Sequence, residues 1–458
     1  MKDLIEIDYF YILDIAWSFL FMLLLMMYVN TKKKEYEHLD YFKYYKTNIY
    51  VKIVLSLVYA FYYTSIVEGG DTLAYWDGAI KLNHLFWKDT SMYFAEIFKT
   101  PDLNTMYFQH YDAATGFPPL WIYKEPESWF ISKVLSFFTF FTFNSYLVTT
   151  LVLAYISSKA SWKLFELVHS FQLNTNKYIA YAVVLIPSVS FWCSGINKDM
   201  IVLYCSIMLI YNAFQILSLD KETKFKNFLW VGFYVFLLYH IRDFMISTIA
   251  VALIFTYSAR LANKYREQRF TFYSIRILSI VVGLLFFAYQ GDGITNSDKL
   301  EEAAVIQKDF ATNETYEGSR YDLGVTDYSA TGMLQAFPVA VIAGFYRPFI
   351  WESLKFTLIF NGLEGAFFLY LTYIFFRRGA FAKMNLIRKH EFFIFAFFFA
   401  ILMAYMAGVT SGLLGVLVRF KAPLIPFLML LLTIDVKLKD KNNVQIMNIK
   451  SKKEIKNE

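Results

Sequence analysis

The stretch YIAYAVVLIPSVSFWCSGINKDMIVLYCSIMLIYNAF, residues 178–214, decides the fold class. Two apolar runs meet at the charged pair Lys198 and Asp199, and each run is about as long as a membrane-spanning helix. Such runs exceed buried strands and most core helices of soluble domains. We therefore expect membrane spans on both sides of a charged seam. That seam lies either at the water interface or beside a functional site.

The composition of the whole chain points the same way. Of its 458 residues, 57% are hydrophobic and 20% are aromatic, well above the usage of an ordinary soluble domain. The net charge of +6 gives no indication of nucleic-acid binding, because the basic residues fall in loops between apolar runs. Cys193 and Cys205 lie in or beside these runs and have no metal-ligand spacing. The sequence predicts an all-α, polytopic transmembrane helical bundle with about 10 to 11 crossings.

The predicted spans form one integral membrane domain over residues 1–434, followed by a basic cytoplasmic tail at 435–458. They cover residues 9–30, 47–66, 129–157, 178–195, 199–217, 228–257, 271–290, 353–376, 391–410 and 412–434. A further apolar piece lies at 334–350. Whether 129–143 and 334–350 cross the membrane or lie on it stays open at this level.

Charge in the connecting loops sets the orientation of the spans. Short loops rich in Lys and Arg are typical of the cytoplasmic side, and here they fall at 31–46, 158–177, 218–227, 258–270 and 377–390. The long segments 67–128 and 291–333 are acidic, which favours the outer side. We expect amphipathic helices lying on the membrane surface in these two segments. The N-terminus is then outside and the C-terminus cytoplasmic.

The same rule predicts a hairpin within residues 228–257, because basic loops flank this segment at both ends. The turn falls at YHIRDF, residues 239–244, and leaves two arms of about 13 to 15 residues each. Either the hairpin reaches the outer side only marginally, or it is re-entrant. Polar backbone at membrane depth is tolerated only where protein or water surrounds it.

Charged and polar residues beside the apolar runs all map to the outer half of the membrane in this topology. Ionisable groups at membrane depth are costly and usually mark a function. Arginine suits a phosphate, because its planar fork can bind the oxygens in pairs, and a nearby carboxylate can act as a general base. The predicted catalytic residues are Asp71, Asp199 and Asp243, and the predicted substrate-binding residues are Tyr75, Asp77, Lys198, His240, Arg242, Arg347 and Arg419.

Each of these residues also has a purely structural interpretation. Lys198 and Asp199 could begin a helix that Asn197 caps, and Arg242 and Asp243 could be a local ion pair in a turn. Arg347, followed by proline, could end an interfacial helix. Arg419 and Lys421 could extend their charged ends to the membrane surface.

Three short motifs resemble bacterial envelope polysaccharide enzymes. The stretch GGDTLAYWD at 69–77, a long outer loop and many spans resemble membrane glycosyltransferases of the C-type fold, which use polyprenyl-linked donors. In that family a second acid follows the aspartate, whereas Thr72 stands here. The form GDTLAY is similar to O-antigen and exopolysaccharide polymerases. PSVSFWCSGINKDM at 187–200 and VRFKAPLIPFLML at 418–430 resemble bacterial membrane proteins grouped near them.

The resemblance implies glycosyl transfer from a polyprenyl-phosphate-linked saccharide to a glycan acceptor. The site would face outward from the bacterial inner membrane, with membrane lipid as a partner and no nucleic acid. Asp71 would be the base or would position the acceptor, Arg242, Arg347 and Arg419 would bind phosphate, and Lys198 and Asp199 would support the site. Aromatic residues of the first outer segment, such as Tyr107, Tyr111, Trp87 and Trp121, could stack on sugar rings.

No cofactor is required by this reading, although Asp71 and Asp77 could share a divalent cation, Mg²⁺ or Mn²⁺. Two alternatives stay open. One is a transporter or flippase for a lipid-linked glycan or another anionic substrate, which would use the same arginines without a base. The other is an assembly subunit of an envelope complex.

Overall fold

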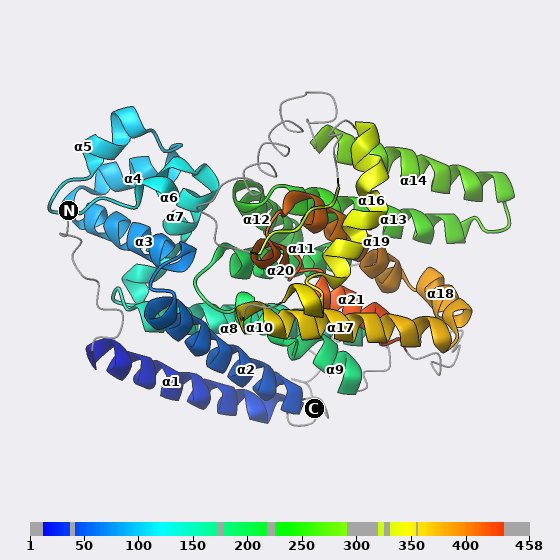
Figure 1. The fold of residues 1–458 in the computed structure, drawn as a ribbon, viewed down its shortest axis with the longest axis horizontal. Coiled ribbons are helices and arrows are strands. Elements are labelled where there is room, and N and C mark those ends of the chain that lie inside the picture. Colours follow the sequence, from blue (N-terminus) through cyan, green and yellow to red (C-terminus); the bar gives the residue numbers. More distant parts are fainter. Residues whose placement is uncertain are drawn as a thin grey trace. The chain divides into compact units, whose positions relative to one another are not determined.

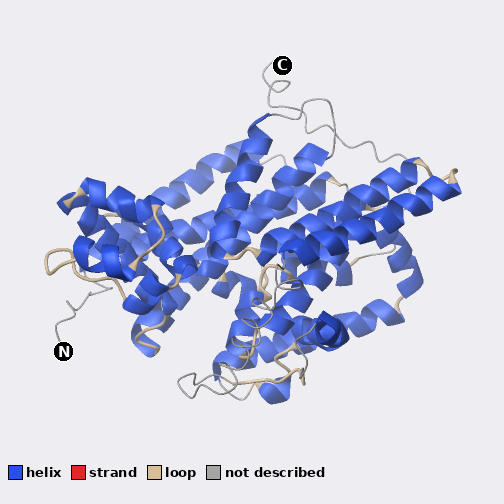
Figure 2. Cartoon of the chain, turned by 90° about the horizontal axis from the view of Figure 1, so that it is seen from above, coloured by secondary structure: helices blue, strands red, loops and turns tan. Residues whose placement is uncertain are grey.

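The chain forms helices throughout the part described by the computed structural model, which covers residues 12–36, 42–171, 177–217, 225–290, 319–324, 330–353 and 356–434 (Figure 1). In these ranges Figure 2 shows helices and loops and no strand, and the only β-type pairing is an isolated bridge between Arg320 and Leu413. The predicted all-α class is confirmed. The tail at 435–458 and most of the outer segment 291–333 lie outside the described residues.

The chain divides into two compact units. The first contains residues 1–162, 189–205 and 236–242, and the second contains residues 163–188, 206–235 and 243–458. The helices of the first half are α1 (Ile12–Tyr36), α2 (Phe42–Phe61), η1 (Tyr62–Ile66), α3 (Asp71–Lys88), α4 (Thr90–Phe98), η2 (Leu103–Tyr107), α5 (Phe108–His110), α6 (Leu120–Lys124), α7 (Pro126–Phe141), α8 (Tyr146–Ser170), α9 (Lys177–Val184), α10 (Pro187–Trp192) and α11 (Lys198–Leu217).

The second half of the chain continues with longer helices. They are α12 (Phe225–Ile241), α13 (Phe244–Lys264), α14 (Arg269–Gln290), α16 (Ala330–Tyr346), η3 (Ile350–Glu352), α17 (Phe356–Arg377), α18 (Ala380–Lys389), α19 (Glu391–Thr410), α20 (Leu414–Phe420) and α21 (Ile425–Leu432).

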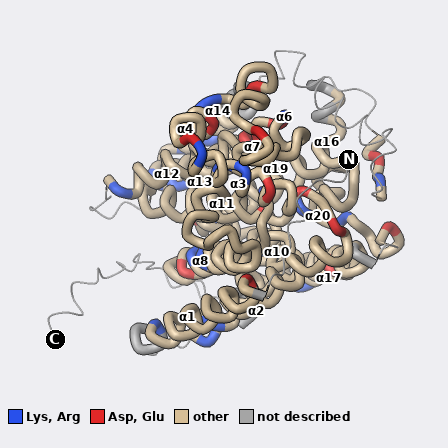
Figure 3. Tube along the Cα trace, turned by 90° about the vertical axis from the view of Figure 1, so that its left-hand side faces the viewer, with Lys and Arg blue, Asp and Glu red and all other residues tan. Residues whose placement is uncertain are grey.

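Six of the described helices are long and apolar enough to cross a membrane, and two bent helix pairs raise the number to eight. The six are Leu13–Lys32, Phe42–Ile66, Lys198–Leu217, Phe244–Lys264, Leu358–Arg377 and Glu391–Thr410. In α1 the lysines gather at the C-terminal end and leave the middle of the helix uncharged (Figure 3). The polytopic character is thus confirmed, with fewer full-length crossings than the ten or eleven predicted from hydropathy.

The run 271–290 forms the continuous helix α14, which is not among the six, and 334–350 contains the shorter apolar helix Gln335–Tyr346. Three of the predicted spans are apolar runs that the fold breaks. The run 129–157 becomes α7 and α8, which meet at 108°, where Phe143 and Asn144 adopt left-handed backbone angles with φ of 55° and 57°. The run 412–434 becomes α20 and α21, bent by 72° around Pro423. The run 178–195 is interrupted before Pro187. Proline removes a backbone hydrogen-bond donor and clashes with the preceding turn of a helix. A hydropathy profile does not detect this effect.

The segment 228–257 is broken at the predicted position. α12 ends at Ile241 and α13 begins at Phe244, so Arg242 and Asp243 form the junction. The two helices have 17 and 21 residues, longer than the predicted arms. Both continue into the flanking basic stretches, because long Lys and Arg side chains can remain in a helix while their charged ends reach water.

The segment 67–128, which we predicted to lie outside, is built around α3. We expected α3 to lie on the membrane surface, but its apolar residues Tyr75, Trp76, Ala79 and Leu82 are buried within the protein. α3 packs closely on α7: a Cβ on Gly78 would lie 2.6 Å from Oγ of Ser132 and 3.0 Å from Cζ3 of Trp129. These apolar residues of α3 therefore form the core of this segment.

In the second unit, α16 and α19 pack backbone to backbone. A Cβ on Gly344 would lie 2.1 Å from the carbonyl oxygen of Ala404, and one on Gly408 would lie 2.2 Å from that of Ala340. Small residues at such crossings let membrane helices approach closely, and the close approach stabilises the helix pair through van der Waals packing.

Candidate functional site

The charged seam at Lys198 is the first residue pair of α11. Asn197 caps this helix: its Oδ1 accepts from the N–H of Met200 at 2.7 Å, and its Nδ2 donates to the carbonyl of Trp192 at 2.7 Å. The helix-start interpretation of Lys198 and Asp199 is therefore confirmed. Lys198 and Asp199 do more than begin the helix, because both side chains also make long-range contacts.

Asp199 forms an ion pair with Arg242, 43 residues further along the chain. Nη2 of Arg242 lies 3.0 Å from Oδ1 of Asp199, and the two side chains are 7% and 0% exposed. The start of α11 and the 239–244 turn therefore lie side by side. A buried pair of this kind requires both partners, because either charge alone in an apolar setting is costly.

Lys198 faces a second set of carboxylates. Its Nζ lies 3.5 Å from Oε2 of Glu127, and Glu125 and Asp71 also interact with it electrostatically. Glu127 is 61% exposed at its side chain, whereas Lys198 is 16% exposed. The sequence analysis missed Glu125 and Glu127, since nothing in the local pattern indicates that the start of α7 reaches the start of α11.

Four helix ends therefore contribute to one cluster, which we call the seam cluster: Asp71, Glu125, Glu127, Lys198, Asp199 and Arg242. Asp71 begins α3, the glutamates begin α7, Lys198 and Asp199 begin α11, and Arg242 follows α12. Helix N-termini carry partial positive charge, so three of the four ends favour an anion there.

Local structure fixes Asp71 at the start of α3. Gly70, the preceding residue, has a φ of 94°, which residues other than glycine rarely adopt. A Cβ there would also stand 3.0 Å from the ring of Tyr63. Thr72 is fully buried, and its hydroxyl lies 3.3 Å from that of Tyr146. The carboxylate of Asp71 is half-buried at the positive end of its helix.

Asp77 belongs to a different part of α3. Its Oδ1 lies 3.3 Å from Nζ of Lys81. Six residues separate Asp71 from Asp77, which places them about 9 Å apart along the helix and about 120° apart around it. That separation does not suit a cation shared by the two carboxylates. Among the described residues, no group of three or more His, Cys, Asp and Glu side chains is placed to hold a metal ion.

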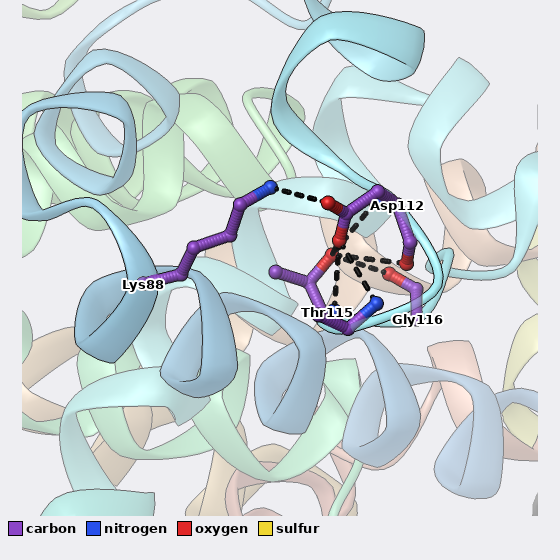
Figure 4. Close-up of polar contacts among 5 residues, drawn as sticks. Lys88, Asp112, Thr115 and Gly116 are labelled. Atoms are coloured by element: carbon purple, nitrogen blue, oxygen red, sulfur yellow. Dashed lines mark hydrogen bonds and ion pairs between the residues drawn. The ribbon is translucent and has the colours of Figure 1, made fainter.

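Burial raises the pKa of Asp77, and the charge of Lys81 opposes that rise. Next to this pair, a turn at residues 112–116 covers Lys81. The carboxylate of Asp112 accepts from the N–H groups of Ala114 and Thr115 and pairs with Lys88 at 2.8 Å (Figure 4). A Cβ on Gly116 would lie 2.9 Å from Nζ of Lys81, so the turn packs directly on the ammonium group.

The aromatic residues of this segment pack mainly on each other. Tyr107 and Tyr111 are buried, and they contact Tyr123 at ring distances of 4.9 and 6.2 Å. Burial raises the pKa of Tyr111 well above its ordinary value. Tyr75 is also buried. These rings form the core of the segment, and the predicted stacking residues that remain exposed are Trp87 and Trp121.

Glu96 lies at the centre of this core and is fully buried. Its Oε1 lies 2.8 Å from Nδ1 of His110 and accepts from the hydroxyl of Tyr123 at 3.0 Å. His240, a predicted substrate-binding residue, stacks on Phe130 of α7 with ring centroids 4.8 Å apart. Its Nδ1 lies 3.0 Å from the carbonyl of Phe236.

The other predicted residues, Asp243, Arg347 and Arg419, belong to the second unit. Asp243 is exposed and precedes α13, and Arg419 is half-buried in α20. Arg347 pairs with Glu352 at 3.3 Å, and its guanidinium lies 4.9 Å from the centroid of Tyr321. Nζ of Lys421 donates to the carbonyl of Arg347 at 2.6 Å.

Sequence analysis also missed a buried polar face on α2. Asn48, Lys52 and Ser56 are all fully buried, and their spacing of four residues places them on one side of the helix. Nζ of Lys52 donates to the carbonyl of Val189 at 3.2 Å. Polar residues repeated at every fourth position of an apolar run indicate one polar side of a helix, and this pattern could have identified the face from the sequence.

No protein-family model, no curated protein and no solved structure matches this chain. The resemblance carried by residues 69–77, 187–200 and 418–430 therefore stays a prediction.

Proposed function

We propose that this protein is a membrane glycosyltransferase or polysaccharide polymerase that acts on a polyprenyl-phosphate-linked saccharide. The reaction takes place at the outer face of the bacterial inner membrane, and the acceptor is a glycan. The N-terminus lies outside and the C-terminus in the cytoplasm. The observation that carries the proposal is the seam cluster, in which Lys198 and Arg242 lie among carboxylates at the beginning of an apolar span.

The seam cluster suits a lipid-linked phosphate for two reasons. Three helix N-termini favour an anion there. Lys198 is the cation that can bind it, since Asp199 already neutralises Arg242 and the four carboxylates of the cluster outnumber its two cations. Glu127, the partner of Lys198, is largely exposed, and exposed ion pairs contribute little free energy. A phosphate can therefore replace Glu127 as the partner of Lys198 at small cost.

Asp71 is the residue that we assign to the chemical step. The acceptor hydroxyl attacks the anomeric carbon of the donor sugar and forms the new C–O bond. The bond from that carbon to the phosphate oxygen breaks, and the phosphate leaves with the electron pair. Asp71 takes the proton of the acceptor hydroxyl as a general base. Lys198 stabilises the charge that develops on the leaving phosphate.

A transporter for a lipid-linked glycan or another anionic substrate is the second candidate. It is favoured by the discontinuous pair α20 and α21, bent by 72°, with the buried Lys421 in the break. Discontinuous helices with polar groups at the break are typical of transporter substrate sites. A transporter would bind the same donor but would need no base.

Purified protein in proteoliposomes, given a fluorescent polyprenyl-diphosphate-linked saccharide and an acceptor glycan, separates these functions. We expect glycan extension with release of polyprenyl diphosphate. Asp71→Asn should abolish turnover and leave donor binding unchanged. Lys198→Met should weaken donor binding roughly ten- to a hundredfold, as expected for one charge-assisted hydrogen bond.

Asp102→Asn is the matched control, because Asp102 is an exposed carboxylate of the same segment that caps a short helix at Asn104. It should retain full turnover. If the intact donor moves across the bilayer at the same rate in the wild type and in Asp71→Asn, the protein is a transporter and the proposed enzyme function is wrong. Absence of donor binding by the wild type would contradict both and favour an assembly subunit.

A further inference from the structure

Large aromatic side chains project from one region of the first unit. Phe98 and Phe141 are each more than four-fifths exposed, and Trp87 and Phe143 are about three-quarters exposed. With Phe94, they form what we call the aromatic patch. Contiguous exposed apolar surface of this kind on a folded protein usually marks a contact with a partner or a membrane.

Ring contacts connect the members of the patch. Phe94 and Phe98 of α4 stack with centroids 6.2 Å apart and planes inclined by 13°. Phe94 also contacts the buried Tyr93, which touches Phe86 and Phe140. Phe86 in turn contacts Trp87 at 5.2 Å. Rings of α3, α4 and α7 therefore meet around Tyr93, next to the ends of α3 and α7, and α4 extends this aromatic surface to Phe98.

Phe143 extends this surface to a membrane-spanning helix. Its ring stacks on Trp17 of α1 at 5.7 Å, and α1 is one of the spans, with Leu13, Phe19 and Leu24 exposed along it. Phe143 is held at a φ of 55°, a conformation that costs a bulky residue free energy. Such strain at an exposed aromatic residue points to a function for its position.

We propose that the aromatic patch is a lipid-binding surface, which inserts into the bilayer interface at the level of Trp17. The lipid-facing surface of α1 continues directly into the patch, which identifies lipid as its partner. Aromatic side chains are enriched at membrane–water interfaces. Lys99, exposed directly after Phe98, can reach the phosphate layer of the lipids. The proposal does not depend on the reaction, because it rests on the exposure and the ring contacts of the patch.

Spin labels on single cysteines test this proposal in the full-length protein. The background lacks Cys193 and Cys205, which are both buried, and the protein is reconstituted into vesicles of phosphatidylethanolamine and phosphatidylglycerol. The labels replace Phe98 and Phe141. Leu24 on α1 gives the lipid reference, and Ala113, exposed in the turn at 112–116, gives the water reference. The measurement is the ratio of collisions with oxygen, which dissolves in lipid, to collisions with a water-soluble nickel chelate.

We expect the ratio at positions 98 and 141 to shift toward that at position 24 and away from that at position 113. A ratio equal to that at position 113 would overturn the proposal, because the patch would then face water. Immobilised labels with little access to either reagent would also overturn it, in favour of a protein partner or a second copy. Thermal unfolding of each labelled protein checks that the fold is retained.

Discussion

Asp199→Asn tests whether the seam cluster depends on its buried ion pair. The carboxylate of Asp199 is fully buried 3.0 Å from the guanidinium of Arg242. Two unit charges at that distance interact by about 5 kcal/mol at an effective dielectric of 20. Removing one partner of a buried pair costs about 3–5 kcal/mol, because the remaining charge stays buried. We therefore expect a loss of about 3–5 kcal/mol in the free energy of unfolding.

The assay is equilibrium unfolding in detergent micelles, combined with a double-mutant cycle. Arg242→Met should cost about as much as Asp199→Asn, and the double variant should cost clearly less than the two together. The coupling energy should be at least about 2 kcal/mol, within the range of residues in direct contact. Glu127→Gln is the control. Its pair with Lys198 is 3.5 Å long and largely exposed on the glutamate side, so it should cost less than about 1 kcal/mol.

The reasoning is refuted if Asp199→Asn costs no more than Glu127→Gln. It is also refuted if the coupling between the two buried positions is below about 0.5 kcal/mol, the level expected of independent sites.

Three further substitutions test packing and charge elsewhere. Gly195→Ala should destabilise the fold by roughly 1–3 kcal/mol, because the added Cβ would stand 2.2 Å from Cδ1 of Tyr59; a thermal unfolding temperature equal to that of the wild type would contradict this packing. Gly232→Ala, where nothing lies within 4 Å, should stabilise α12 by up to about 1 kcal/mol. Hydrogen bonds, first of all from Lys88, hold the pKa of Asp112 at about 2, below its unfolded value of about 3.9. The stability that the carboxylate contributes is therefore complete above about pH 4 and lost as the pH falls toward 2. The unfolding temperatures of wild type and Asp112→Asn should converge over that window, and a difference that persists at pH 2 would contradict the assignment.

Hydropathy predicted the long spans well, because a helix needs about 20 apolar residues to cross a bilayer. It could not predict where spans break. Phe143 and Asn144 turn the chain between two apolar helices. Asparagine tolerates left-handed backbone angles, but a bulky phenylalanine rarely adopts them. The break at Arg242 and Asp243 was predictable, because charges interrupt the apolar pattern there.

The candidate site was only partly predictable for a similar reason. The predicted topology placed Asp199 and Arg242 in the same half of the membrane, and the structure pairs them across 43 residues. Nothing in the sequence indicated Glu127, because an exposed carboxylate needs no partner. The contact between Lys198 and Glu127 therefore follows only from the packing of α7. Tyr107 and Tyr111 show the reverse case, in which residues expected to meet a sugar form a core instead.

Helix α7 joins two features that both lie at the membrane surface in our proposals. Glu127, at its first turn, pairs with the beginning of the α11 span, while Phe141, at its last residue, belongs to the aromatic patch. Fourteen residues of helix separate them, a distance of about 21 Å. A helix with both ends at one interface must run parallel to the bilayer plane. It then acts as a fixed spacer, and it holds the seam cluster about 20 Å sideways from the anchoring lipid contact. A lipid-linked donor would have to approach along the membrane surface within that distance.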